Sequence, residues 1–216
     1  PFFVHFRLHS AYSLAEGTFQ ISDLVSAVHD LGQPAVAITD TFNNFAALEF
    51  SDKAADKGIQ PIIGAQVVVL DNDGLRGEIV LLVQNEAGWL NLSKLISAAL
   101  LEESDTPHIP VDRLMALSDG LIVLTGGANK GYVAGAAADG QIDLAKTRLK
   151  GLMSAFSGRV YVELQRHGIA REMAAEKHLL ALAYELNIPI VATNDCYFAK
   201  PEMAAAHEVL LCISQS

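Results

Sequence analysis

The sequence has few of the residues that cross-link secreted proteins or bind nucleic acid. Its only cysteines, Cys196 and Cys212, are too few for a disulfide framework, and this fits a reducing, cytoplasmic location. Lys and Arg number 15 against 25 Asp and Glu, a net charge of −10, and no basic run occurs. Strong DNA binding by this chain alone is therefore not expected, because basic groups dominate affinity for phosphates. No apolar stretch is long enough to cross a membrane.

What the sequence does contain is enough apolar material for a folded core. Hydrophobic residues make up 51% of the 216 positions, which excludes an intrinsically disordered chain. The length allows one or two domains, and no shift in composition marks a boundary, so we expect a single domain over residues 1–216. The chain starts without methionine and stops just after a helical pattern, so we expect it to be a fragment of a larger protein.

Strand and helix patterns alternate along the whole chain. Apolar runs of four to eight residues between turn residues favour strands, and apolar residues spaced by three and four favour helices. A turn at 71–74 predicts a hairpin, and the polar stretch 102–110 predicts a loop. The expected strands are 2–9, 35–39, 60–70, 78–83, 121–125, 160–164 and 190–192; the expected helices are 21–32, 45–57, 86–101, 142–156, 169–186 and 201–213.

This alternation predicts an α/β protein of about seven strand–helix units, each roughly 30 residues long. Such units build either a closed TIM-like barrel or an open doubly wound sheet. We favour the barrel, because polar residues cluster where several strands end, and barrels gather those ends around one site.

Ionisable side chains lie at or just beyond several strand ends. Imidazoles and carboxylates that converge from different strands are what a divalent metal site requires. Each has a plainer interpretation as well: Asp40 precedes a helix and could cap it, and Glu49 could lie on a solvated helix face. The candidate ligands are His9, Asp40, Glu49, His167 and Asp195.

Six segments together resemble the PHP (polymerase and histidinol phosphatase) domain family. Within it, they are most similar to the N-terminal PHP domains of bacterial replicative DNA polymerase III α subunits. The resemblance covers nearly the whole chain, in order and at compatible spacings. The segments are HFRLHSAYS (5–13), AITD (37–40), ALEF (47–50), GIQPIIG (58–64), QRHG (165–168) and ATND (192–195).

The resemblance implies a distorted (β/α)7 TIM-like barrel and, in active members, a multi-metal cluster that hydrolyses phosphoesters. It also implies that the parent chain performs template-directed DNA synthesis in a part of the polymerase that this chain does not include. In that setting the domain is expected to pack against the polymerase thumb and palm and to dock the separate proofreading exonuclease.

Several positions depart from the ligand pattern that the resemblance implies. Arg7 stands where the first strand has the first histidine of a His-x-His pair, and Thr41 follows Asp40 in place of a histidine. Further expected ligands are replaced by Glu78, Gly127 and Tyr197, whereas the five candidate ligands named above match.

The replacement by Arg7 is the most costly for a metal, because it places a permanent cation in the pocket. Two unit positive charges about 4 Å apart repel by about 4 kcal/mol at an effective dielectric constant near 20, and a divalent ion multiplies this cost. We therefore expect a vestigial pocket of Arg7, His9, Asp40, Thr41, Glu49, Glu78, His167, Asp195 and Tyr197, with Arg7 as the counter-charge of its carboxylates, no catalytic residue and no metal.

Two alternatives remain open. The chain could be an active phosphoesterase or 3′–5′ exonuclease that holds Mn²⁺, Zn²⁺ or Mg²⁺ through the five matching ligands. It could also be the PHP domain of the error-prone paralogue of the same polymerase subunit.

Overall fold

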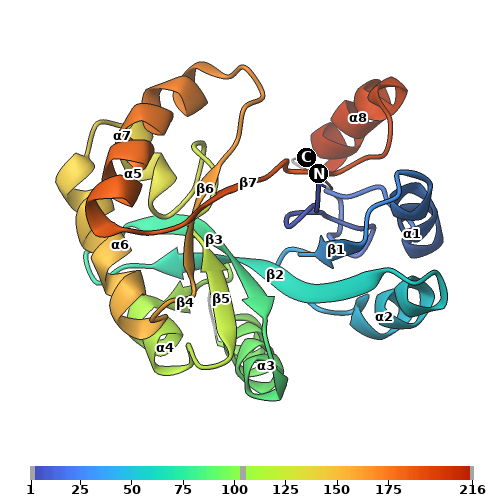
Figure 1. Cartoon of the computed structure of the whole chain (residues 1–216), viewed down its shortest axis with the longest axis horizontal. Helices are drawn as coiled ribbons and strands as arrows, with labels where there is room; N and C mark the ends of the chain where they lie inside the picture. Colours follow the sequence, from blue (N-terminus) through green and yellow to red (C-terminus); the bar gives the residue numbers. More distant parts are fainter. Residues whose placement is uncertain (1–2, 103–105, 215–216) are drawn as a thin grey trace. The chain divides into compact units, whose positions relative to one another are not determined.

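The computed structural model describes residues 3–102 and 106–214, and these divide into two compact units. The first unit comprises residues 1–65 and 194–216, and the second comprises residues 66–193. Helices and strands alternate through both, as the sequence predicts (Figure 1).

The first unit is built around a pair of helices. It contains α1 (Ile21–Asp30), β1 (Ala35–Ile38), α2 (Ala47–Asp56), the start of β2 (Gln60–Leu70), a short 3-10 helix (Pro201–Met203) and α8 (Ala204–Ser214). The buried face of α1 carries Leu24, Val25 and Val28, which share a hydrophobic core with Phe50 and Ala54 of α2. Residues 35–38 of β1 pair in parallel with residues 60–63 of β2.

The second unit holds most of the sheet. Its elements are the end of β2, β3 (Arg76–Val83), α3 (Glu86–Leu101), β4 (Ile109–Pro110), α4 (Val111–Ala116), β5 (Leu121–Leu124), α5 (Ala134–Ala138), α6 (Ile142–Ala155), β6 (Val160–Leu164), α7 (Ala170–Leu186) and β7 (Ile190–Ala192). The strand order is β2-β3-β5-β6-β7, and β4 pairs with β2. Helix α3 packs on β3 and β5, and α5 packs on α6 and α7 (Figure 1).

One strand of the second unit breaks the parallel pattern of a regular barrel. β5, β6 and β7 pair in parallel, but β3 pairs with β5 in the antiparallel sense, from Val80 opposite Leu124 to Val83 opposite Leu121. The turn at Asp71–Gly74 accounts for the direction of β3. It connects β2 directly to β3 and reverses the chain, without the crossover helix that parallel neighbours need. Both strands are largely buried, as their apolar runs indicate.

The predicted strands and helices are found with end shifts of a few residues, apart from the first strand. The segment predicted at 2–9 is not a regular strand: it makes a single bridge, between Leu8 and Cys196, and Phe2 lies outside the described residues. Its alternating pattern is explained by backbone hydrogen bonds with β1, in which Ala37 donates to His5 and Thr39 donates to Leu8.

Three short elements were not predicted: β4, α4 and α5. They have two to six residues each, too few for a hydrophobic period to be recognised. Part of the predicted loop at 102–110 lies outside the described residues, and its end forms β4. In the part of the chain that the structure describes, no helix is both long and apolar enough to span a bilayer.

Two helical glycines provide a test of this packing. A Cβ at Gly88 in α3 would lie 1.9 Å from the carbonyl oxygen of Gly120, whereas a Cβ at Gly151 in α6 would meet only Met115 Cε, at 3.7 Å. We expect Gly88→Ala to lower the free energy of unfolding by about 2–3 kcal/mol, because the backbone must move apart. Gly151→Ala should instead be neutral or stabilise by up to about 1 kcal/mol, because alanine is the better helix former. Chemical denaturation of both variants measures this, and equal effects would contradict the packing.

Candidate functional site

A buried ion pair forms the centre of the polar cluster in the first unit. Arg7 Nε lies 2.9 Å from Asp195 Oδ1, and His9 Nε2 lies 3.3 Å from the same oxygen. Arg7 and His9 are 2% and 0% exposed. The backbone sets this arrangement, because His9 N–H donates to the carbonyl of Cys196 and Cys196 N–H donates to the carbonyl of Arg7. Two segments that are distant in sequence thereby present their side chains to each other.

Opposing effects act on the Asp195 carboxyl. Burial by itself raises its pKa, but the hydrogen bond from His9, the charges of Arg7 and His9 and the contact with Arg7 together outweigh burial. The net pKa of Asp195 is lowered, so the group is an anion at neutral pH. The pocket therefore contains a fixed carboxylate neutralised by a fixed guanidinium.

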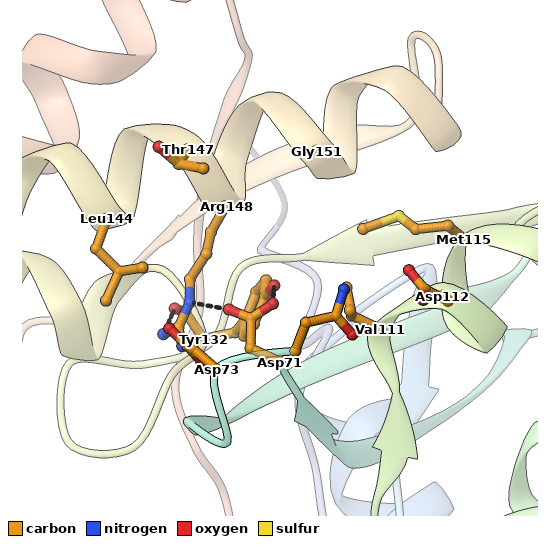
Figure 2. A pocket seen from close by; sticks show the side chains of 11 residues that line it. Asp71, Asp73, Val111, Asp112, Met115, Tyr132, Leu144, Thr147, Arg148 and Gly151 are labelled. Atoms are coloured by element: carbon orange, nitrogen blue, oxygen red, sulfur yellow. Dashed lines mark hydrogen bonds and ion pairs between the residues drawn. The ribbon is translucent and has the colours of Figure 1, made fainter.

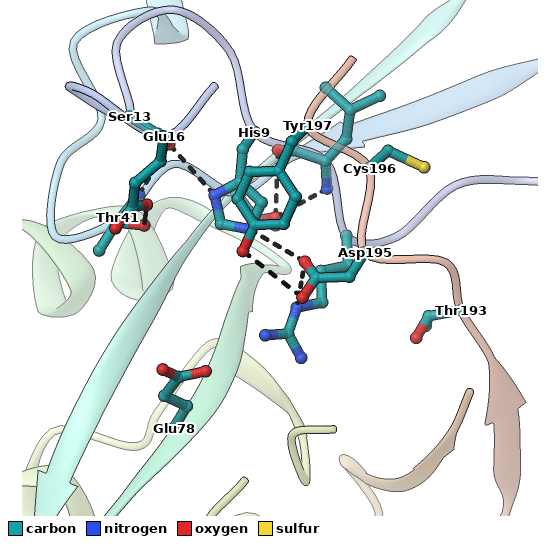
Figure 3. Close-up of polar contacts among 12 residues, drawn as sticks. His9, Ser13, Glu16, Thr41, Glu78, Thr193, Asp195, Cys196 and Tyr197 are labelled. Carbon is teal, nitrogen blue, oxygen red and sulfur yellow. Dashed lines mark hydrogen bonds and ion pairs between the residues drawn. The ribbon is translucent and has the colours of Figure 1, made fainter. Parts of the chain in front are cut away.

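An aromatic side chain covers the histidine. The Tyr197 ring stacks on the His9 ring with centroids 4.4 Å apart and planes 5° apart (Figure 3). The Tyr197 ring also lies near the ring of His207 in α8, at 5.5 Å between centroids, and His207 Nε2 lies 2.7 Å from the carbonyl oxygen of Glu16. Tyr197 is thus held between two imidazole rings, and it occupies one face of His9.

Asp40 has its own set of hydrogen-bond donors. Its Oδ1 accepts from the Ser10 N–H and the Ser13 hydroxyl, both at 2.7 Å, and its Oδ2 accepts from the Ser10 hydroxyl at 2.8 Å. Because Ser13 gives its only hydroxyl proton to Asp40, the 3.1 Å contact between Ser13 Oγ and His9 Nδ1 requires the proton on Nδ1. Nδ1 of His9 is therefore bonded to Ser13, and Nε2 faces Asp195 Oδ1 at 3.3 Å.

Thr41 and Glu49 have partners of their own. The Thr41 hydroxyl donates to a Glu16 carboxylate oxygen. Glu49 forms an ion pair with Lys53 at 2.9 Å and accepts a hydrogen bond from the Tyr12 hydroxyl at 3.3 Å. The hydrogen bond and the charge of Lys53, with the bond from Tyr12, lower the pKa of Glu49 despite the opposing effect of desolvation.

The expected role of Arg7 as counter-charge for three carboxylates needs correction. Arg7 faces Asp195, whereas serine donors satisfy Asp40 and a lysine pairs with Glu49. The expectation overlooked hydroxyl groups, which can satisfy a carboxylate without carrying charge.

The candidate ligand of the second unit has a different environment. His167 Nδ1 lies 2.6 Å from Glu172 Oε1, and the His167 N–H donates to Glu172 Oε2, also at 2.6 Å. Burial alone would raise the pKa of Glu172, but these hydrogen bonds outweigh it and lower the pKa. A carboxylate that accepts from Nδ1–H leaves Nε2 with its lone pair, which is how metal-binding histidines are commonly oriented.

Two of the replaced positions also lie in the second unit. Glu78 forms an ion pair with Lys130 at 3.9 Å, and its backbone bridges to Gly131. Gly127 has little room for a side chain, because a Cβ there would lie 2.3 Å from Gln165 Oε1. The Gln165 side chain therefore fills the space that a side chain at position 127 would need.

The fit to a metal cluster can be judged from these partners. In the first unit, Arg7 brings a positive charge beside Asp195, Nδ1 of His9 is bonded to Ser13, and both oxygens of Asp40 have donors. Within residues 3–102 and 106–214, no three His, Cys, Asp or Glu side chains gather closely enough to hold a metal ion. With a guanidinium beside Asp195 and donors on both oxygens of Asp40, the residues of the first unit do not fit a multi-metal cluster.

The sequence and the structure can now be compared with known proteins. A family model of the PHP domain matches residues 5–167 of the chain. The chain belongs to the PHP domain family. This PHP domain is 43% identical over 221 residues to "DNA polymerase III subunit alpha" of Caulobacter vibrioides and 38% identical over 220 residues to the protein of the same name from Pseudomonas aeruginosa. Those alignments include 98% and 99% of this chain but 19% and 18% of the relatives, so the chain spans about a fifth of their length.

Two solved structures have a similar fold. One is a protein from Bifidobacterium adolescentis proposed to be a metal-dependent phosphoesterase, with a TM-score of 0.63 at 14% identity, covering 92% of this chain and 89% of that one. The other is an amidohydrolase from Chromobacterium violaceum, with a TM-score of 0.56 at 11% identity and 96% of each chain covered. The predicted fold class, an α/β protein of the distorted TIM-like barrel type, is confirmed.

Sequence reasoning missed the residues that hold the candidate ligands in place. Ser10 and Ser13 lie in the turn after the first segment, and their spacing to Asp40 of about 30 residues gives no local signal. Glu172 could have been found, because a glutamate in the first turn of a helix often accepts hydrogen bonds from the backbone just before it.

The buried ion pair should contribute to stability. We expect Arg7→Ala to lower the free energy of unfolding by about 3–5 kcal/mol, because it removes the buried guanidinium that faces the partly buried Asp195 carboxylate. The matched control is Arg166→Ala, which removes an arginine from an exposed pair with Glu176 and should cost less than about 1 kcal/mol.

The dependence on pH follows from the lowered pKa of Asp195. Stability from this group is present above the ordinary carboxyl pKa near 4 and is lost as pH falls through the lower folded value. Urea unfolding between pH 7 and pH 2 should therefore show a steeper acid loss in the wild type than in Arg7→Ala. Unchanged stability of Arg7→Ala at pH 7 would mean that Arg7 does not contact Asp195.

Proposed function

We propose that this chain is the PHP domain of a DNA polymerase III α subunit and that it serves as a scaffold with a metal pocket that has lost its function. The observation that carries the proposal is the Arg7 guanidinium buried against the Asp195 carboxylate. A guanidinium is a permanent cation, so it supplies the charge that a metal ion would otherwise bring to that carboxylate.

The neighbours of this ion pair support the same proposal. For His9 to bind a metal through Nε2, the ion would have to lie beside the Asp195 carboxylate that Arg7 already pairs with. Asp40 would have to give up hydroxyl and backbone donors that already satisfy it. Each exchange has a cost, and the repulsion between a divalent ion and Arg7 adds to it.

Metal binding and hydrolysis test the loss of function directly. We expect calorimetric titration with Mn²⁺ or Zn²⁺ to show no stoichiometric binding with a dissociation constant below micromolar. We also expect no metal-dependent hydrolysis of 4-nitrophenyl phosphate or single-stranded DNA. Hydrolysis that Asp195→Ala abolishes would contradict the proposal and favour the phosphoesterase alternative.

A variant with restored ligands provides the positive control. Arg7→His, Thr41→His and Tyr197→His together remove the cation and the stacked ring and introduce three imidazoles. This variant should bind Mn²⁺ or Zn²⁺ at least about tenfold more tightly than the wild type, because both charge and lone pairs then favour the metal. Unchanged affinity would show that the replaced positions are not what prevents binding.

The wider setting of the domain belongs to the same proposal. Template-directed DNA synthesis would be performed by the polymerase portion of the parent chain, against whose thumb and palm this domain would pack. The domain by itself would bind DNA weakly, and its arginines support this, because most of them are paired with carboxylates. A cytoplasmic location is consistent with Cys196 and Cys212 both being free thiols.

Docking of the proofreading exonuclease is the partner interaction that we propose. Calorimetry with the purified exonuclease subunit of the same organism should give a one-to-one complex. The triple variant with Arg7→His, Thr41→His and Tyr197→His should bind the exonuclease equally well, because a scaffold does not need its metal pocket. A chain that folds but binds no exonuclease would contradict the docking role and leave the metal-binding result unaffected.

A further inference from the structure

Helix α8 buries little of its surface in the first unit. Among its residues, Ala204–Ser214, only His207 is buried. The Nε2 atom of His207 lies 2.7 Å from the carbonyl oxygen of Glu16. Val209 and Ile213, by contrast, are 60% and 66% exposed. Most of the apolar side chains of this helix therefore contribute nothing to the core of the chain.

The outward face of α8 is apolar along its length. Ala205, Val209, Cys212 and Ile213 are exposed, and they occupy positions i, i+4, i+7 and i+8, so they share one face of the helix. We call these four residues the α8 stripe. Glu208 is the only Asp, Glu, Lys or Arg among residues 204–214.

Helix α6 shows the pattern of a face that stays in water. Asp143, Thr147 and Lys150 are exposed at the spacing i, i+4 and i+7, and all three are polar. Figure 2 shows Arg148 of the same helix pointing toward Asp71, to which its Nε donates at 2.8 Å, whereas Thr147 does not point there. An apolar stripe on the outer side, as in α8, is instead typical of a helix that packs against another element.

The composition of α8 limits what can cover the α8 stripe. The helix has 11 residues, about half of the roughly 20 that a bilayer span needs. It contains no Lys or Arg, which interfacial helices use to attract acidic lipids. An apolar protein surface is therefore the partner that fits.

The length of the relatives indicates where such a surface comes from. The chain spans about a fifth of the length of the Caulobacter and Pseudomonas proteins, and α8 is the last element that the structure describes. Consecutive elements of a chain are usually neighbours in space. A segment on a short linker also has an effective concentration in the millimolar range. A segment of the same polypeptide therefore has the advantage over a separate protein.

We propose that, in the parent subunit, the segment that continues beyond residue 216 packs apolar side chains on the α8 stripe, so that α8 is an internal helix there. This inference rests on the proposed function, because it takes the parent to be a polymerase α subunit. It does not depend on the state of the metal pocket. Metal binding by the chain would contradict the loss of function and leave this inference intact, and the reverse also holds.

Chemical labelling of Cys212 tests the proposal. Cys212 is an exposed free thiol of the α8 stripe, whereas burial raises the pKa of Cys196 to about 11 and slows the reaction of that thiol. Labelling with N-ethylmaleimide, read by mass spectrometry of the peptide that contains Cys212, compares the 216-residue chain with the full-length subunit of the same organism. We expect labelling at least about tenfold slower in the full-length subunit, because a covered thiol reacts only when the structure opens locally. Equal rates would overturn the proposal.

Matched variants separate cover of the α8 stripe from general shielding by a larger protein. Thr147→Cys places a thiol on the polar face of α6, and it should be labelled at the same rate in both proteins. Val209→Asp should lower the melting temperature of the full-length subunit and leave that of the 216-residue chain unchanged, because Val209 is exposed in this chain. Thr147→Asp should change neither. Slower labelling at both thiols, or equal effects of Val209→Asp on both proteins, would contradict the proposal.

Other occupants of the α8 stripe predict other results. Slow labelling of Cys212 in the 216-residue chain that becomes faster on dilution would identify a second copy of the chain. Protection of the full-length subunit only after the exonuclease is added would identify the exonuclease. Either result would overturn the proposal.

Discussion

The pairing of Arg7 with Asp195 joins two segments of the first unit that are far apart in the sequence. A carboxylate in that position is stable only with a cation beside it, and the backbone bonds between the segments around residues 7–9 and 195–196 keep the two groups together. The guanidinium supplies to this carboxylate the positive charge that a metal ion would otherwise bring. The chemistry of the pocket follows from this one exchange.

The other candidate ligands of the first unit take part in structural networks. Two serines bind Asp40, and one of them also fixes the proton of His9 on Nδ1. Histidine and aspartate are residue types that a hydrolase would use for metal binding. Here the hydrogen bonds of His9 and Asp40 connect loops to one another. His167 in the second unit is held at Nδ1 as well, by the Glu172 carboxylate. The family resemblance in sequence thus extends over residues whose side chains form these networks.

Much of the fold was predictable, because its signals are local. The hydrophobic period gave β2, α3, β6 and β7 with the observed ends, and the turn at 71–74 indicated the hairpin. The first strand was mispredicted because alternation of side chains is common to any extended segment, whether or not it has regular strand partners. Helices of six residues or fewer were missed because they contain less than two turns of pattern.

The sequence by itself determined the family, the alternation of strands and helices, and the presence of an arginine where a metal ligand was expected, because these are properties of residue order. Only the tertiary structure decided which carboxylate Arg7 neutralises, that serines satisfy Asp40, and that Lys53 pairs with Glu49. The reason is physical. Ion pairs and hydrogen bonds depend on distances of about 3 Å between groups far apart in the chain, and residue spacing does not encode those distances.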